Sequence, residues 1–83
     1  MLSELKEAKN KVVGIKQVMR AAESEELTCI YIAEDTDDEL RAALLNTAHV
    51  QKIRYVMAAS RAELGEACLI QVPAACAGIL KQN

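Results

Sequence analysis

Hydrophobic positions in the first third of the chain predict a helix, a strand and a second helix. Ser3 is a candidate N-cap for a short first helix that buries Leu5. Residues 12–14 then predict a short strand that ends at Gly14. Directly after this glycine, the apolar residues recur at helical spacing, in the order Ile15, Val18, Met19 and Ala22. A second helix is therefore expected to begin immediately after the glycine.

The rest of the chain predicts three more strands and two more helices. Residues 28–33 form a β-prone apolar run, as expected for a strand buried on both faces. Thr36 and Ser60 are each followed three residues later by Glu, and these two capping boxes predict a third and a fourth helix, with a strand at 55–57 between them. A proline in 70–73 predicts a loop, and 74–80 predict a last strand.

Helices that alternate with strands predict an α/β fold, namely a three-layer α/β/α sandwich on a mixed sheet of about four strands. The 83 residues suit one domain, spanning 1–83. Apolar residues make up 52% of the chain, but they include no Phe, no Trp and only two Tyr. We therefore expect a soluble protein whose core consists of many small aliphatic side chains.

Charge is distributed unevenly along the chain. The net charge of −2 divides into +3 over residues 1–20 and −5 over the remaining 63 residues. A basic segment on an acidic body suggests an anionic partner that is contacted locally. The three cysteines form no C-x-x-C pair and lie in apolar runs, and the N-terminus has no signal-like apolar stretch. These features predict a cytoplasmic protein with buried thiols and no membrane partner.

Catalytic and metal chemistry find little support in the sequence. The single histidine, His49, is expected on a helix surface rather than as a base. The acidic run 34–39 lacks the Gly and Glu positions of an EF-hand, so capping and compensation of the helix dipole explain it better. No phosphate-binding glycine motif is present. We expect no enzyme activity, no catalytic residues, no metal site and no cofactor.

Two segments have the composition of a nucleic-acid contact. Gly14, Lys16, Gln17 and Arg20 stand at a helix start, where free N–H groups, two cations one turn apart and an amide could bind phosphate and read a base edge. Ordinary solvated residues of a surface helix would have the same spacing. The segment 70–74 is either a buried lead-in to the last strand or an exposed apolar platform for an extruded base.

Four fragments in order resemble a known family. They are Val12-Val13-Gly14-Ile15-Lys16-Gln17, Ile30-Tyr31-Ile32-Ala33-Glu34-Asp35, Glu63-Leu64-Gly65-Glu66-Ala67 and Ile70-Gln71-Val72-Pro73-Ala74-Ala75. Together they are similar to the kink-turn RNA-binding ribosomal protein family of the L7Ae type, in its small bacterial YbxF-type branch. The resemblance covers nearly the whole chain and implies the α/β/α sandwich that the pattern predicts.

The resemblance implies that the start of the second helix enters the widened major groove beside the sheared G·A pairs of a kinked RNA. It places Lys16 and Gln17 against the guanines and Arg20 against a base or phosphate, while Gly14 permits close approach of the backbone. It also implies that bulged nucleotides are covered by the loop Ile70, Gln71, Val72, Pro73 and Ala74. Asp35 and Arg61 match positions near the RNA and are secondary candidates.

Leu69 departs from the family pattern, which usually has glycine after the Ala-Cys or Ala-Ala pair of the fourth helix. If this position has a positive φ, the leucine either strains the turn or reshapes the loop. Two functions follow as hypotheses. The first is a monomeric, non-enzymatic RNA-binding protein that stabilises kink-turns in ribosomal or regulatory RNA, with the ribosome as a possible partner. The alternative is a protein-interaction module on the same fold that has lost specific RNA binding.

Overall fold

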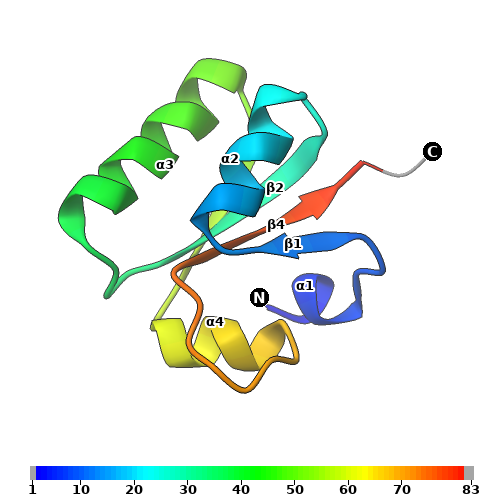
Figure 1. Ribbon diagram of the computed structural model, residues 1–83, viewed down its shortest axis with the longest axis vertical. Helices are drawn as coiled ribbons and strands as arrows, with labels where there is room; N and C mark the ends of the chain where they lie inside the picture. The colour runs from blue at the N-terminus through cyan, green and yellow to red at the C-terminus, as the bar shows by residue number, and fades with distance from the viewer. Residues whose placement is uncertain (1, 82–83) are drawn as a thin grey trace.

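Four helices and four strands alternate along residues 2–81, which are the residues that the computed structural model describes (Figure 1). In chain order they are α1 (Ser3–Glu7), β1 (Lys11–Val13), α2 (Ile15–Glu23), β2 (Leu27–Ala33), α3 (Asp38–Gln51), β3 (Arg54–Ala58), α4 (Arg61–Ala67) and β4 (Cys76–Leu80). The order of elements predicted from the sequence is confirmed.

The last strand lies inside the sheet, whose order is β1-β4-β2-β3. β4 pairs antiparallel with β1 on one side and with β2 on the other, and β2 pairs parallel with β3. The sheet is therefore mixed, as predicted. This order places the carboxyl ends of β1, β2 and β3 and the start of β4 at one edge of the sheet.

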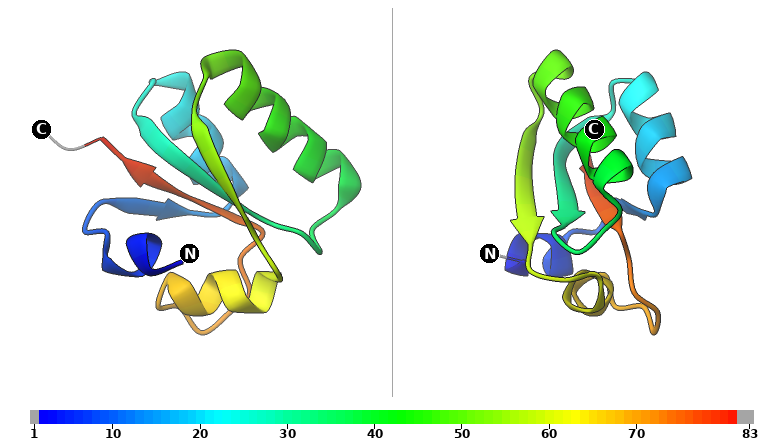
Figure 2. Two further views of the ribbon diagram at one scale, coloured as in Figure 1. Left: turned by 180° about the vertical axis from the view of Figure 1, so that it is seen from behind. Right: turned by 90° about the vertical axis from the view of Figure 1, so that its left-hand side faces the viewer.

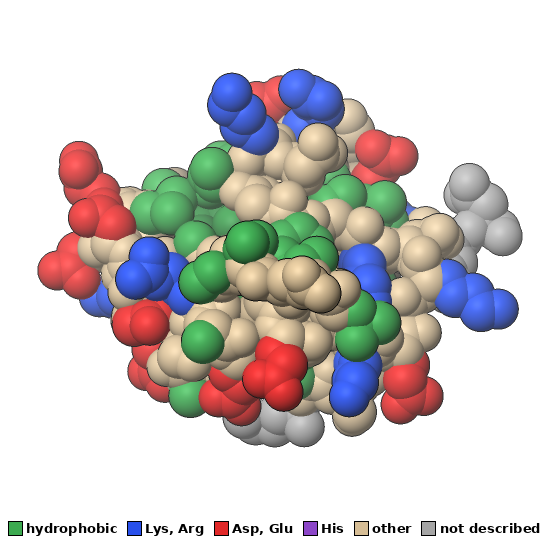
Figure 3. Space-filling model, turned by 60° about the horizontal axis from the view of Figure 1, so that its bottom comes forward, with side chains coloured by type: hydrophobic (Ala, Val, Ile, Leu, Met, Phe, Trp, Pro, Cys, Tyr) green, Lys and Arg blue, Asp and Glu red, His purple; other side chains and the backbone are tan. Residues whose placement is uncertain are grey.

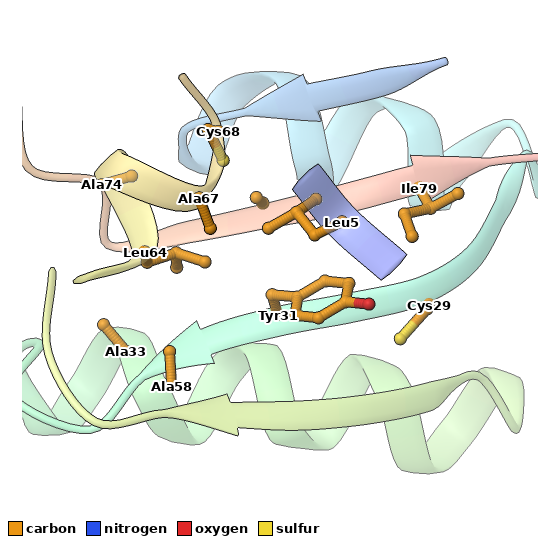
Figure 4. Packing of buried hydrophobic residues seen from close by; sticks show 11 residues of the cluster. Leu5, Cys29, Tyr31, Ala33, Ala58, Leu64, Ala67, Cys68, Ala74 and Ile79 are labelled. Carbon is orange, nitrogen blue, oxygen red and sulfur yellow. The ribbon is translucent and has the colours of Figure 1, made fainter. Parts of the chain in front are cut away.

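Two hydrophobic clusters, one on each face, hold the helices on the sheet. Ile30 and Ile32 of β2 pack with the apolar faces of α2 and α3, whereas Tyr31 of β2 packs with α1 and α4. Figure 2 shows the two helix layers on opposite sides of the strands, and Figure 4 shows Leu5 of α1 over Tyr31. Most of the other side chains in the α1 and α4 cluster are Ala, Cys or Leu. The predicted three-layer sandwich and its core of small side chains are confirmed.

Two of the three predicted helix caps are displaced by one residue. Leu2 rather than Ser3 is the N-cap of α1, so the serine lies inside the helix and caps nothing. Asp37 rather than Thr36 caps α3 through a carboxylate that accepts from Leu40 N, because Thr36 is buried in the preceding turn. At α4, Ser60 Oγ does accept from the N–H of Glu63 at 3.1 Å, as predicted.

Strand boundaries differ from the predicted ones by one or two residues. β4 begins at Cys76 rather than at residue 74, since Ala74 and Ala75 bond to α4 and β2 as part of the preceding loop. β2 begins at Leu27 and is buried on both faces except at Thr28, whose side chain is exposed. His49 is exposed on α3, as expected. No helix among residues 2–81 is long and apolar enough to cross a membrane.

The buried polar groups of the core are held neutral by their surroundings. Cys29, Cys68 and Cys76 are buried and free, and burial raises the pKa of the Cys76 thiol to about 11. Tyr31 is fully buried, and its hydroxyl has no hydrogen-bond partner among the described residues. Desolvation by burial is the main cause that raises the pKa of Tyr31 to about 12, and the coulombic effect of the nearby Cys29 is the second. The hydroxyl therefore adds no net hydrogen bond to the folded state.

Tyr31→Phe is expected to keep or slightly raise stability at pH 7, by up to about 1 kcal/mol, because it removes a buried polar group without a partner. An unfolded tyrosine ionises near pH 10, below the folded value of about 12. The wild type should therefore lose stability as pH rises from 10 toward 12, and the variant should lose less. Urea unfolding followed by circular dichroism at pH 7 and 11 measures this. Tyr55→Phe, at a half-exposed tyrosine, is the control; identical pH dependence of wild type and Tyr31→Phe would contradict the expectation.

Candidate nucleic-acid interface

The predicted contact residues come together at one edge of the sheet, here called the site edge, which faces the viewer in the right-hand view of Figure 2. Backbone hydrogen bonds join its segments. Gly14 N donates to Cys76 O at 3.0 Å, Ala33 N to Ala75 O at 2.9 Å, and Ala74 N to Arg61 O at 3.0 Å. The start of α2, the end of β2, the start of α4 and the loop before β4 are thus fixed relative to one another.

The start of α2 is a cationic helix end without a side-chain cap. Gly14 is its N-cap, with φ 95° and ψ 157°. Residues other than glycine rarely adopt this backbone conformation. The first turn of α2 contains no acidic residue. Lys16, Gln17 and Arg20 are exposed, whereas Val18 on the other face is buried against the sheet. This end of α2 therefore presents N–H groups, two cations and an amide to solvent.

The loop between α4 and β4 is divided between anchoring and exposed residues. Ala74 is buried, and Ile70 is half-buried against the α1 and α4 cluster. Gln71, Val72 and Pro73 are exposed, and the Val72 side chain is 62% accessible. Both sequence interpretations of this segment therefore hold in part, because its ends are anchored in the core and its middle offers apolar surface.

Gly65 allows this loop to lie directly on α4. A Cβ atom at this position would stand 2.1 Å from Val72 O and 3.2 Å from Pro73 Cα. These neighbours include backbone atoms, which cannot turn away as the end of a flexible side chain can. The exposed loop residues can therefore hold this position only because residue 65 has no Cβ atom.

Asp35 and Arg61 form a contact within the protein at the site edge. Asp35 Oδ1 accepts from Arg61 N at 2.8 Å and lies 3.6 Å from Arg61 Nε. This carboxylate ties the turn after β2 to the first residue of α4. The Arg61 guanidinium remains about half exposed and can still turn to a ligand.

The sequence interpretation missed Arg41, which organises the turn between β2 and α3. Its Nη1 donates to Glu34 O at 2.9 Å and to Thr36 O at 3.0 Å, and its Nη2 donates to Asp38 Oδ1 at 2.6 Å. One guanidinium thereby fixes the carbonyls on both sides of Asp35. The three-residue spacing of Asp38 and Arg41 on a helix was the only signal in the sequence.

Charged side chains of both signs surround an apolar centre on one face of the molecule. Figure 3 shows hydrophobic side chains at the centre of this face, with Lys, Arg and acidic side chains interspersed around its rim. The exposed acids of the turn after β2 and of the start of α3 are Glu34, Asp35, Asp37, Asp38 and Glu39. No group of three or more His, Cys, Asp or Glu suited to a metal ion occurs within residues 2–81. These acids therefore follow the end of β2 at the site edge without forming a metal site.

Comparison with known proteins gives a consistent assignment. The sequence profile of the Ribosomal protein L7Ae/L30e/S12e/Gadd45 family matches residues 1–83. The RNA-binding protein YbxF of Geobacillus stearothermophilus is 36% identical over 70 residues, covering 84% of this chain and 85% of that protein. An RNA-binding protein of Halalkalibacterium halodurans is 32% identical over 78 residues, covering 94% and 95%.

Solved structures show the same fold. The Giardia lamblia 15.5kD RNA binding protein superposes with a TM-score of 0.89 at 24% identity, covering 99% of this chain and 72% of that one. A protein of unknown function from Bacillus halodurans C superposes with a TM-score of 0.83 at 20% identity, covering 96% and 80%. At these identities the likeness concerns the arrangement of helices and strands.

Gly65→Ala is expected to lower the free energy of unfolding by about 1 to 3 kcal/mol, because the added Cβ overlaps backbone of the loop. The helix propensity of Ala acts in the opposite direction by about 1 kcal/mol. Urea unfolding measures the change, and Glu66→Ala, at the next and exposed helix position, is the matched control. Because helix propensity alone would raise the free energy of unfolding by about 1 kcal/mol, an increase of that size in Gly65→Ala would show that the loop does not rest on α4.

Arg41→Met is expected to lower stability by about 1 to 2 kcal/mol, since it removes charged donors from two carbonyls. It should also speed amide hydrogen exchange across residues 34–38, because the turn loses its internal support. Arg54→Met is the matched control, because within residues 2–81 Arg54 is paired only with the exposed Glu4. If both variants left exchange in 34–38 unchanged, Arg41 would not organise the turn.

Proposed function

Because the chain belongs to the ribosomal protein family L7Ae/L30e/S12e/Gadd45, we propose that it is a non-enzymatic RNA-binding protein that recognises and stabilises kink-turns in ribosomal or regulatory RNA. One observation carries the proposal. The uncapped cationic start of α2 and the exposed loop before β4 share the site edge and are tied to it by backbone hydrogen bonds. We further propose that the protein acts as a monomer in the cytoplasm.

The start of α2 would provide the sequence-dependent part of recognition. In a widened major groove, Lys16 and Gln17 would donate hydrogen bonds to the O6 and N7 acceptors of the guanines in G·A pairs. Arg20, one turn further on, would neutralise a phosphate and set the register of the helix on the backbone. Gly14 supports this approach, since no Cβ stands between the backbone and the groove.

The loop before β4 would hold the nucleotides that the kink expels. Sequence-specific RNA recognition commonly targets unstacked bases, which pack on apolar side chains and expose their polar edges to hydrogen bonding. Val72 and Pro73 supply apolar surface, and Gln71 supplies an amide. Ile70 and Ala74 support this surface from the core side.

Stabilisation of the kink would follow from differential binding. A free RNA that is kinked for only part of the time is shifted toward the kinked form by a protein that binds only that form. The geometry of the site edge is set before RNA arrives, because backbone bonds fix its segments. The acidic surface beside it would oppose non-specific contact with other phosphates.

The Lys16→Ala, Gln17→Ala double variant is expected to bind a kink-turn duplex at least about tenfold more weakly than the wild type, at roughly 1 to 3 kcal/mol per good base contact. Fluorescence anisotropy at fixed salt measures the affinities for the kink-turn duplex and for the same duplex with its G·A pairs replaced. Gln51→Ala with Lys52→Ala is the matched control, with the same residue types and charge change in exposed positions at the far end of α3.

Equal, salt-sensitive binding of the wild type to both duplexes would overturn kink-turn recognition and leave only charge attraction. A second candidate, a protein-interaction module, is favoured by the exposed Val72 and Leu69 side chains of the loop before β4. Isolation of the protein with a protein partner and without RNA, after nuclease treatment of a parallel sample, would support this candidate instead.

A further inference from the structure

Leu69 is the one residue between α4 and Lys81 whose backbone turns into the left-handed region. Its φ is 63°, its N–H donates to Glu66 O at 3.0 Å, and the N–H of Ile70 donates to Gly65 O at 3.1 Å. This pair of bonds is the Schellman arrangement, in which glycine is the usual residue at the left-handed position. Ile70 packs into the core as the hydrophobic partner of such a turn. The backbone of Leu69 is therefore fixed from both sides.

The leucine side chain makes no buried contact that would offset the free-energy cost of this backbone conformation. A β-carbon is disfavoured in the left-handed region, and the Leu69 side chain is 66% exposed, so burial does not compensate. The other two non-glycine residues with positive φ among residues 2–81 are Glu25 and Lys52, which carry solvated charges. At Leu69 alone, a strained backbone displays a large apolar group to water, and strain of this kind is found at ligand contacts.

Leu69 is also placed next to the surface that the proposed function uses. Leu69 and Val72, 66% and 62% exposed, stand on one short segment with the exposed Gln71 between them and the anchored Ile70 beneath. The Schellman bonds at one end and the approach to Gly65 at the other hold this segment in place. Two apolar groups that flank an amide match the chemistry of an unstacked base, which has apolar faces and a polar edge.

We propose that Leu69 is a further RNA-contact residue, which together with Val72 packs against an unstacked base of the bound RNA. The inference rests on the proposed function and adds a specificity residue to it. The strain at Leu69 is then a cost of displaying an apolar contact at a point where glycine would give a more stable turn but no contact.

The test is Leu69→Gly, measured for thermal stability and for affinity to the kink-turn duplex. We expect a higher melting temperature, because the strain is relieved, together with about fivefold weaker binding, because the apolar contact is lost. Lys52→Gly is the matched control, since it relieves a left-handed residue at the end of α3, with φ 56°, far from the loop. It should raise the melting temperature and leave the affinity unchanged.

A second RNA carries abasic nucleotides in its bulge. If Leu69 packs on a base, Leu69→Gly should weaken binding to the intact RNA but not to the abasic one. Equal affinity of wild type and Leu69→Gly for the intact duplex, or an equal loss on both RNAs, would overturn the contact while leaving the proposed function standing. Failure of the wild type to distinguish the duplex with G·A pairs from the one without them would overturn both.

Discussion

Three consecutive residues, Ala74 to Cys76, bond through their backbones to three different parts of the molecule. Ala74 donates to the start of α4, the carbonyl of Ala75 accepts from the end of β2, and that of Cys76 accepts from Gly14 at the start of α2. Such pairing tolerates no change of length or register, because a shift by one residue would send each bond to the wrong partner. The relative position of the helix end and the loop is thus set by the start of β4 and the two residues before it.

Local signals in the sequence were sufficient for the elements and for the start of α2. The start of α2 could be located because Gly14 stands between an apolar pair and a helical repeat. A glycine there can end a strand and adopt the positive φ of this N-cap, which few other residues do. The cap at Thr36 was wrong by one residue, because a hydroxyl and a carboxylate side by side compete for the same N–H groups and the burial of Thr36 leaves Asp37 to cap α3. The cap at Ser3 was wrong because α1 begins one residue earlier, after Leu2, which makes no side-chain hydrogen bond.

The interior of the site could not be derived from the sequence in the same way. Whether Ile70 and Ala74 are buried depends on the approach of the loop to Gly65, a contact between residues whose spacing carries no periodic signal. Arg41 likewise acts by donating hydrogen bonds to two backbone carbonyls. Every residue has a backbone carbonyl, so the residue types at these positions do not reveal the acceptors. Kink-turn recognition and its contact residues remain predictions that rest on resemblance and geometry.

The antiparallel placement of β4 also determines on which side of the molecule this strand ends. Because β4 starts at the site edge and runs away from it, Leu80 lies at the opposite edge, where Lys81 N donates to Glu26 O between α2 and β2 (Figure 1). A fluorophore or surface tether attached at the exposed position 81 is carried on the side of the sheet that faces away from the start of α2. The molecule can therefore be immobilised through position 81 with its candidate binding surface turned toward solution.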